Sequence, residues 1–467
     1  MIIMSFKRKL NLFDATMIVV GNVVGAGIFT TAGFLANELN NPWFFAGIWI
    51  FGGLLTLCGA LTYAEMAGMF PRSGGDYLYL KAAYGPWAGF LLNWICFWII
   101  NPGSIAVLSI ALVKYLIGFF NYSGVMSEKL IALTVVVFFS FINYRGIRLT
   151  GTTHNLWTIG SLAILIFFII GGLTSGKGDW RHFTGSETNA FSISKFFGPA
   201  MIAVIFSYSG WFVSAYLGDE VKKPERNLPL SLMLGTIIVI VLYAAINVVY
   251  LYAMPIESLK GVINVGQATG ERLMSSRFVQ AITLAIILAI AASINATVLA
   301  GARLSYAIAK DGFFWSHFEK LHTRYGTPHV ALFIQAALAC LYIVGDTFEN
   351  ILGAVVFIML LSSIGSALAH LILRRKKPLL ERPYRTPFHP LIPMLFIIAY
   401  SYIAVQIFLS SPVRSALGVA IALSGIPFYL YARGRESKNT ANLVAAVPSS
   451  HNADIPNKEM MTRITYR

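Results

Sequence analysis

Two glycine- and serine-rich stretches interrupt apolar segments and are the strongest candidates for binding chemistry. They are VVGNVVGAGIFTTAG, residues 19–33, and FSYSGWFVSAYLGDE, residues 206–220. Glycine tolerates unusual backbone angles, and an unwound turn frees amides and carbonyls that lipid cannot satisfy. Free N–H groups at the start of a half-helix favour an anion, whereas free carbonyls favour a cation. Together the two stretches predict a cradle for a zwitterion.

A second interpretation of the same glycines is tight helix packing, because GNVVG matches the spacing of small residues at helix contacts in membranes. For one helix alone, packing is the stronger interpretation. Both stretches, however, fall at corresponding places, in the first and sixth predicted helices, and many secondary transporters place discontinuous helices in this way. The paired occurrence therefore favours a binding site.

The positions of the ionisable residues narrow the class of ligand. Charged groups inside a membrane are functional candidates by default, but those found here lie near predicted helix ends: Asp14, Glu65, Asp219, Glu220 and Arg303. A cationic ligand should meet a carboxylate, and a dianion should meet a basic residue. The lack of charge at mid-membrane depth favours a small neutral molecule or a zwitterion.

The composition indicates the elements that must position these stretches. Of the 467 residues, 57% are hydrophobic and 12% charged, and the mean hydropathy is +0.70, as in integral membrane proteins. The apolar runs are too long for the strands of a membrane barrel and predict an all-α protein. About twelve spans are expected, at residues 14–37, 43–69, 86–118, 127–145, 150–173, 194–218, 229–254, 277–309, 329–344, 349–373, 390–410 and 413–432.

The net charge of +15 follows from topology rather than from a nucleic-acid partner. Most lysines and arginines fall in alternate connecting segments, and this bias predicts cytoplasmic N- and C-termini. No cleavable leader is expected before the first span. The sequence thus predicts a multi-pass protein of a plasma membrane, such as a bacterial inner membrane, with the lipid bilayer as a partner.

Several other chemistries lack support in the sequence. Cys58, Cys96 and Cys340 fall in predicted spans without metal or redox spacing, and the eight histidines form no ligand pattern. No metal, cofactor or enzymatic activity is therefore expected. An intramembrane enzyme or sensor has only His154 and His370, near helix ends, as weak candidates. A channel is the third alternative, distinguished from a carrier by the absence of counterflow.

The domain organisation follows from the spans. Residues 1–13 form a cytoplasmic N-terminus and residues 433–467 a flexible cytoplasmic tail. Between them lies one transporter domain, 14–432, which divides into a first repeat at 14–173, a second at 194–373 and two further helices at 390–432. The similarity between the halves is weak, so this five-plus-five division is an inference from architecture.

Five motifs make the sequence resemble the amino acid–polyamine–organocation superfamily. They are GNVVGAGIF; YAEMAGMFPRSGGDYLYLKAAYGPWAGFLLNW; FSYSGWFVSAYLGDEVKKPERNLP; RLSYAIAKDGFFW; and RPYRTPFHPLIP. The similarity covers about residues 10–432, and the bacterial relatives of the L-type amino acid transporters look most similar. The resemblance implies an inverted-repeat fold with discontinuous helices 1 and 6, two extra helices, and alternating access.

The resemblance also implies residue roles. A substrate carboxylate would meet the amides of Gly25, Ala26 and Gly27. Phe206 would close over the substrate as a gate on the extracellular side. The ammonium group of the substrate would meet carbonyls near Val23, Phe206, Ser207 and Ser209, with Gly210 in the same break as the last three. Pocket candidates are Asn101, Trp211 and Phe212.

Three positions bear on coupling to an ion, H⁺ or Na⁺. Many members of the superfamily carry a lysine in helix 5, where this sequence has Ser161. Ser293 and Asn295 in helix 8 fall where related folds form an ion site, although interhelical hydrogen bonding is an alternative role for both. Animal relatives use a cysteine between helices 3 and 4 to bond a heavy subunit, and FFNYSGVMSEK has none, so no disulfide-linked partner is expected.

The leading hypothesis is thus a permease for a neutral α-amino acid, working by exchange or ion-coupled symport. A polyamine or cationic amino acid permease or antiporter of the same superfamily is the alternative. That alternative predicts an acidic residue in the pocket, and none stands at the obvious places.

Overall fold

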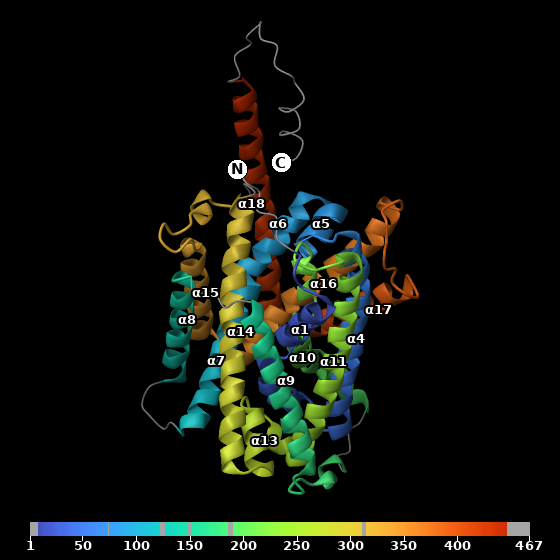
Figure 1. Ribbon diagram of the computed structural model, residues 1–467, viewed down its shortest axis with the longest axis vertical. Coiled ribbons are helices and arrows are strands. Elements are labelled where there is room, and N and C mark those ends of the chain that lie inside the picture. The colour runs from blue at the N-terminus through green and yellow to red at the C-terminus, as the bar shows by residue number, and fades with distance from the viewer. Residues whose placement is uncertain are drawn as a thin grey trace.

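The protein is a bundle of helices (Figure 1). The computed structural model describes residues 8–72, 74–121, 127–146, 151–184, 190–310 and 314–445. Apart from one isolated bridge between Leu10 and Val221, these residues form helices, turns and loops. Nine of the described helices are long and apolar enough to span a membrane, and shorter apolar helices occupy 158–174 and 329–345. The predicted all-α class is confirmed, while the count of twelve spans and the repeat stay predictions.

The first half of the chain begins with an interrupted helix. Its elements in order are α1 (Leu12–Val23), α2 (Ala26–Thr30), α3 (Ala32–Glu38), α4 (Pro42–Met69), α5 (Asp76–Tyr84), α6 (Pro86–Ile95), the π-helix η1 (Cys96–Ile100), α7 (Asn101–Phe120), α8 (Glu128–Tyr144) and α9 (Gly151–Thr174).

The second half contains another interruption, after α10. Its elements are η2 (Trp180–Phe183), α10 (Ala190–Tyr208), η3 (Val213–Leu217), α11 (Pro224–Ala253), α12 (Ile256–Leu259), α13 (Val265–Leu273), α14 (Ser276–Lys310), η4 (Ser316–Glu319), α15 (His329–Gly345), α16 (Phe348–Lys376), α17 (Leu391–Ser410) and α18 (Pro412–Ala445).

Local sequence explains where the first long helices begin. Asn11 and Asp14 form a reciprocal capping box at the start of α1. The side chain of Asn41 accepts hydrogen bonds from two backbone amides of α4, and Pro42 occupies the first turn, where its missing N–H costs nothing. These caps fix the residues at which α1 and α4 begin.

The structure differs from the sequence prediction in the connecting segments. The short helices α5, α12 and α13 lie where only loops between spans were expected. The last helix continues past residue 432, the predicted end of the transporter domain, to Ala445. No glycine or proline occurs between Gly434 and that end, so helical hydrogen bonding can propagate beyond the bundle. The remainder of the predicted tail, 446–467, and residues 1–7 and 122–126 lie outside the described residues.

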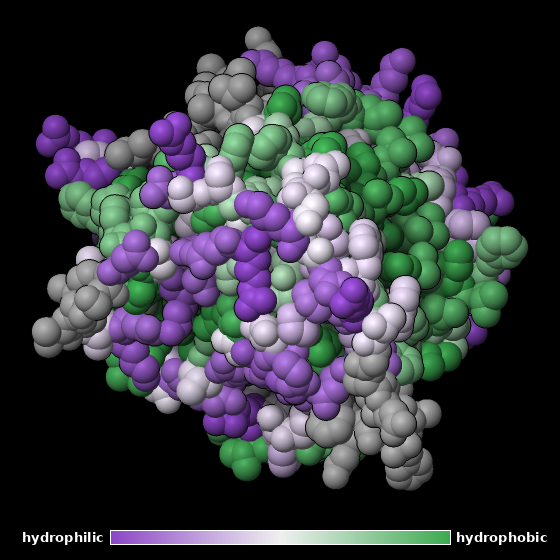
Figure 2. Space-filling model, turned by 90° about the horizontal axis from the view of Figure 1, so that it is seen from below, coloured by the Kyte–Doolittle hydropathy of each residue, from purple (hydrophilic) through white to green (hydrophobic). Residues whose placement is uncertain are grey.

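The outer surface of the bundle is apolar. Large hydrophobic side chains are exposed on α4, α11, α17 and α18, among them Trp43, Val241, Ile398 and Val413. Seen from the end where α13 lies, polar side chains gather over the middle and apolar ones form much of the border (Figure 2). This distribution fits helices that meet lipid around the circumference and water at the ends.

Candidate functional site

The first helix breaks where the glycine pattern predicted. Helix α1 ends at Val23, Val24 has φ −72° and ψ 73°, and Gly25 has φ −121° and ψ −146°, after which α2 begins. The Gly25 amide donates to the carbonyl oxygen of Val23 at 2.7 Å. No side chain caps the start of α2. The first-turn amides of a helix lack intrahelical partners, and the carboxylate site assigned to them here stays a prediction.

The second break follows Tyr208, where α10 ends and a turn leads into η3. Gly210 has a φ of +91°, a backbone angle that residues with a Cβ rarely adopt. A Cβ at this position would also collide with the side-chain amide of Asn22, whose nitrogen donates to the carbonyl oxygen of Gly210 at 3.1 Å. Asn22 therefore links the end of α1 to the turn after α10.

The two breaks lie directly against each other. A Cβ at Gly27 would lie 2.7 Å from Cα of Ser207, so glycine allows the backbones of α2 and α10 to touch. Thr31 reinforces this contact, because its hydroxyl lies 2.7 Å from that of Ser207 and also donates to the carbonyl oxygen of Ala203 at 3.3 Å. The packing and binding interpretations of these glycines therefore coexist.

Tyr243 of α11 joins the two breaks from behind. Its fully buried side chain donates to the carbonyl oxygens of Val23 at 2.7 Å and Ser207 at 3.0 Å. Its ring packs against those of Trp49 and Tyr208, at 6.0 and 4.9 Å between centroids. Sequence reasoning missed this residue, whose only signal is a tyrosine inside an apolar span.

The structure supplies internal partners to some of the carbonyls predicted to bind an ammonium group. Val23 accepts from both the Gly25 amide and Tyr243, each at 2.7 Å. The carbonyl of Phe206 accepts from the amide of Ser209 at 3.0 Å and from its hydroxyl at 2.6 Å. The side chain of Phe206 is buried, with 7% exposed. The roles assigned to these residues stay predictions.

Replacing Tyr243 with phenylalanine removes the hydroxyl that bridges the breaks. Leaving a buried carbonyl without its partner costs about 1–3 kcal/mol. The free energy of unfolding should therefore fall by about 1–3 kcal/mol, seen as a smaller fraction of protein that stays monodisperse after heating in detergent. Tyr252→Phe, on the same helix, is the control, since no hydrogen bond from its hydroxyl is found among the described residues. Equal stability of the two variants would contradict a role for the bridge.

The three coupling candidates have different surroundings. Ser293 donates to the carbonyl oxygen of Ala289 at 3.0 Å and lies beside the first break, 2.9 Å from where a Cβ of Gly25 would stand. Asn295 instead accepts from the side-chain amide of Asn143 in α8 at 2.8 Å, so it makes the interhelical hydrogen bond considered as its alternative role. Ser161 is partly buried, and Thr158, one turn earlier on α9, is the residue that contacts Gly21.

Two of the pocket candidates, Trp211 and Phe212, lie in the turn of the second break, and the third, Asn101, begins α7. The ring of Trp211 packs edge-on against that of Tyr63, with 4.7 Å between centroids, and Phe212 lies 6.3 Å from the same ring. These aromatic side chains fill the bundle between the break and the end where α5 lies. Asn101 follows the π-helix η1, an irregularity frequent at functional sites, and faces Gly301 of α14.

Buried charge is confined to one end of the bundle. Among the described residues, the acidic or basic side chains classed as buried, histidine aside, are Glu65 and Asp76, and both lie near the ends of α4 and α5. In the part of the chain that the structure describes, Glu65 makes no hydrogen bond to either break, and Asp76 bonds to the second interruption only at Tyr216, in η3 beyond the turn. The interior beside the breaks therefore offers neutral hydroxyls and backbone groups to a ligand.

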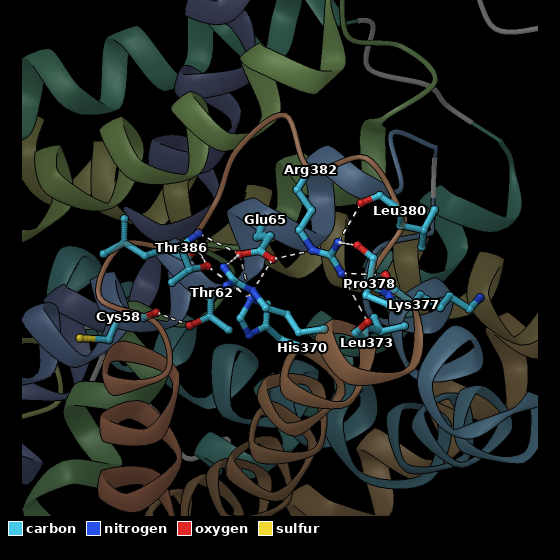
Figure 3. Close-up of polar contacts among 12 residues, drawn as sticks. Cys58, Thr62, Glu65, His370, Leu373, Lys377, Pro378, Leu380, Arg382 and Thr386 are labelled. Atoms are coloured by element: carbon cyan, nitrogen blue, oxygen red, sulfur yellow. Dashed lines mark hydrogen bonds and ion pairs between the residues drawn. The ribbon is translucent and has the colours of Figure 1, made fainter.

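Glu65 is the centre of a polar cluster that joins α4 to α16 and to the segment before α17 (Figure 3). Arg374 makes two hydrogen bonds to its carboxylate, Nε to Oε1 at 2.8 Å and Nη2 to Oε2 at 2.6 Å. Arg382 lies 3.2 Å from Oε1, and Nε2 of His370 lies 3.1 Å from Oε2. The amide of Thr386 donates to Oε2 at 2.8 Å.

Arg382 connects this cluster to the end of α16. Besides its contact with Glu65, its guanidinium donates to four backbone carbonyls, those of Leu373, Lys377, Pro378 and Leu380 (Figure 3). Carbonyls at a helix end lack intrahelical partners, and a guanidinium with five donors satisfies several at once. The cluster fixes the end of α16 relative to α4.

Comparisons with known proteins agree with this architecture. The family model described as amino acid permease matches residues 10–431. The chain is 29% identical to the serine/threonine exchanger SteT of Bacillus subtilis over 437 residues, which cover 92% of this chain and 98% of that protein. It is 28% identical to human Asc-type amino acid transporter 1, covering 91% and 82% of the two chains. The human large neutral amino acids transporter small subunit 2 is also 28% identical, with 91% and 80% covered.

Proposed function

Because the chain belongs to the amino acid permease family, we propose that it is a secondary transporter that moves a neutral α-amino acid across the membrane by alternating access. The single observation that carries this proposal is the contact between two broken helices at Gly27 and Ser207. Neither of the buried acidic residues lies there. Such a site suits a ligand that brings both of its own charges.

The proposed binding mode follows from the backbone groups at the breaks. The substrate carboxylate binds at the amides of Gly25, Ala26 and Gly27, where α2 begins without a capping side chain, and the Gly25 amide exchanges its bond to Val23 for the carboxylate. The ammonium binds at carbonyls of the break after α10, with Phe206 closing over the substrate. Ser293 beside Gly25 offers a neutral hydroxyl at this point.

The proposed architecture has twelve spans arranged as two inverted repeats of five and two further helices. The starts of α1 and the ends of α4 and α16 share one end of the bundle, since Leu10 pairs with Val221 and Glu65 with Arg374. The positive-inside bias places this end in the cytoplasm, in keeping with a bacterial inner membrane. Movement of the broken helices around a fixed site would then expose it to each side in turn.

The decisive experiment is counterflow in proteoliposomes. Vesicles are loaded with one unlabelled amino acid from a panel, and uptake of a labelled neutral amino acid from outside is followed. Transient accumulation driven by internal neutral amino acids is the expected result, and it excludes a channel. If only lysine, arginine or a polyamine drives accumulation, the cationic alternative replaces the proposal, and no counterflow with any of them contradicts a carrier of either kind.

Sodium dependence is tested in the same vesicles by replacing sodium with choline. We propose exchange that needs no sodium, because the side-chain oxygen of Asn295 already accepts a hydrogen bond from Asn143. Uptake should then be unchanged in choline. A loss of uptake that sodium restores would instead assign an ion site beside Gly25 and Ser293.

A further inference from the structure

Asp76 is a second buried acidic residue, separate from the cluster around Glu65. It contacts the segment that follows the break in the second interrupted helix. Asp76, the first residue of α5, is 5% exposed, and its Oδ2 accepts a hydrogen bond from the hydroxyl of Tyr216 in η3 at 2.9 Å. Its Oδ1 is buried without a hydrogen-bond partner. A buried carboxylate with one oxygen unsatisfied is costly, whereas a carboxylic acid tolerates such a place better.

The groups that face Asp76 are neutral. They come from four neighbouring elements and from α5 itself: Tyr63 on α4, Cys96 on η1, Tyr216 on η3, Ser366 on α16 and Tyr79 on α5. The other helix packed closely on α5, α6, contains no ionisable side chain. Burial raises the pKa of the Asp76 carboxyl above its ordinary value, and the hydroxyls of Tyr63, Ser366 and Tyr216 oppose this more weakly.

The cations near α5 are exposed or contact other groups, and Arg72, four residues before Asp76, is exposed. Lys376 of α16 donates to the carbonyl oxygen of Ala83, near the opposite end of α5, at 3.1 Å. Lys81 lies over the ring of Tyr77, and Arg374 and His370 bind Glu65. Among the described residues no ion pair is found for Asp76. Within the described ranges, a negative charge there is favoured by the hydroxyls of Tyr63, Ser366 and Tyr216 and by the amino-terminal end of α5, but by no cation.

The position of Asp76 connects protonation to the moving part of the protein. Tyr216 belongs to η3, the segment that follows the break after α10, and its ring lies 5.8 Å from that of Phe212. Gly75 packs directly on the ring of Tyr216, where a Cβ would come within 2.6 Å. Separation of η3 from α5 would break the Asp76–Tyr216 hydrogen bond and admit water to the carboxyl.

We propose that Asp76 is a proton-binding site: its carboxyl holds a proton while this end of the bundle is closed and releases it when η3 and α5 separate. The ligand of this site is H⁺. The proposal depends on the proposed transport function only in the experiment that measures transport. The closed arrangement binds more protons than the open one. Low pH therefore stabilises the closed arrangement, and this stabilisation is lost as pH rises through the raised pKa of Asp76.

The first test is the pH profile of amino acid counterflow with equal pH on both sides. The wild-type rate should rise from acid pH to a plateau, because opening of this end becomes easier as Asp76 ionises. Asp76→Asn should be slow and independent of pH over the same range, since an amide cannot ionise. Tyr216→Phe removes the hydrogen bond that favours the charged carboxylate and should move the rise to higher pH.

Asp346→Asn is the matched control. Asp346 lies between α15 and α16, at the end away from α5, where Asn350 and Arg414 bind its carboxylate and hold its pKa below the ordinary value. Its variant should retain the wild-type pH profile. If Asp76→Asn also retains that profile, or if the wild-type rate does not vary with pH, the proton site is excluded.

The second test needs no transport and separates this proposal from the proposed function. Infrared difference spectra between high and low pH, recorded on purified protein in lipid, should contain the carbonyl band of a protonated carboxylic acid that Asp76→Asn lacks. The band should titrate at higher pH in Tyr216→Phe. This shift also identifies Asp76 as the source of the band if Asp76→Asn fails to fold. An unchanged set of bands in both variants overturns the proton site even when counterflow is normal, and a lost band supports it even when no counterflow is found.

Discussion

Replacing Glu65 with glutamine is expected to lower the free energy of unfolding by about 3–5 kcal/mol, the usual cost of removing one partner from a buried ion pair. Glutamine has nearly the same size, so the effect reports the lost charge rather than a cavity. Arg382, which is 8% exposed on its side chain, would keep its charge with no carboxylate beside it, and Arg374 would lose one of its two hydrogen bonds, since the amide NH2 of glutamine cannot accept. The measurement is the fraction of protein that stays monodisperse after heating in detergent.

Glu128→Gln is the matched control for this variant. Glu128 also pairs with a basic residue, Lys114, at 2.7 Å, but the two side chains are 49% and 35% exposed. Exposed pairs contribute about 0–1 kcal/mol, so this variant should unfold close to the wild-type temperature. Equal loss of stability in the two variants would show that the burial of Glu65 has no special consequence.

Replacing Gly27 with valine is expected to abolish counterflow while the protein still inserts into the membrane. The added Cβ would lie 2.7 Å from Cα of Ser207 and 3.1 Å from its Cβ, and backbone atoms cannot rotate away. Even one methyl group in a tightly packed place costs about 1–3 kcal/mol, so Gly27→Ala should already slow counterflow by about tenfold or more. Initial rates are compared at equal amounts of reconstituted protein.

Two other glycines calibrate this result. A Cβ at Gly25 would meet the hydroxyl of Ser293 at 2.9 Å, which a side-chain rotation relieves, so Gly25→Ala should reduce transport less than Gly27→Ala. Gly47 on α4 has open space around it, and Gly47→Ala should transport as the wild type does. A normal rate for Gly27→Val would rule out the close contact between α2 and α10.

The sequence predicts the helix breaks because their cause is local. Gly25 and Gly210 interrupt apolar runs, and the structure unwinds at both positions. The membrane class can also be predicted from the sequence, since a long apolar run identifies a span without any information about the segments that pack against it. Helix α5 was missed because its nine residues, DYLYLKAAY, are too short and polar for a span, and its hydrophobic side packs on α16 and α6.

The polar partners could not be predicted from the sequence because they are distant along the chain. Tyr243 is 220 residues from Val23, and Arg374 is 309 residues from Glu65. The sequence identifies Glu65 only as a charge near a predicted helix end, a position that by itself suits a water-facing interface. Only the fold shows that the carboxylate is fully buried and bound by two arginines.

The hydrogen bonds already accepted by Val23 and Phe206 have a consequence for how long a substrate stays. Each carbonyl has two internal donors. In the proposed binding mode an arriving ammonium group replaces such bonds, so its gain is only the difference between a charge-assisted and a neutral hydrogen bond. A small difference means fast dissociation, and such a site favours rapid turnover over tight retention.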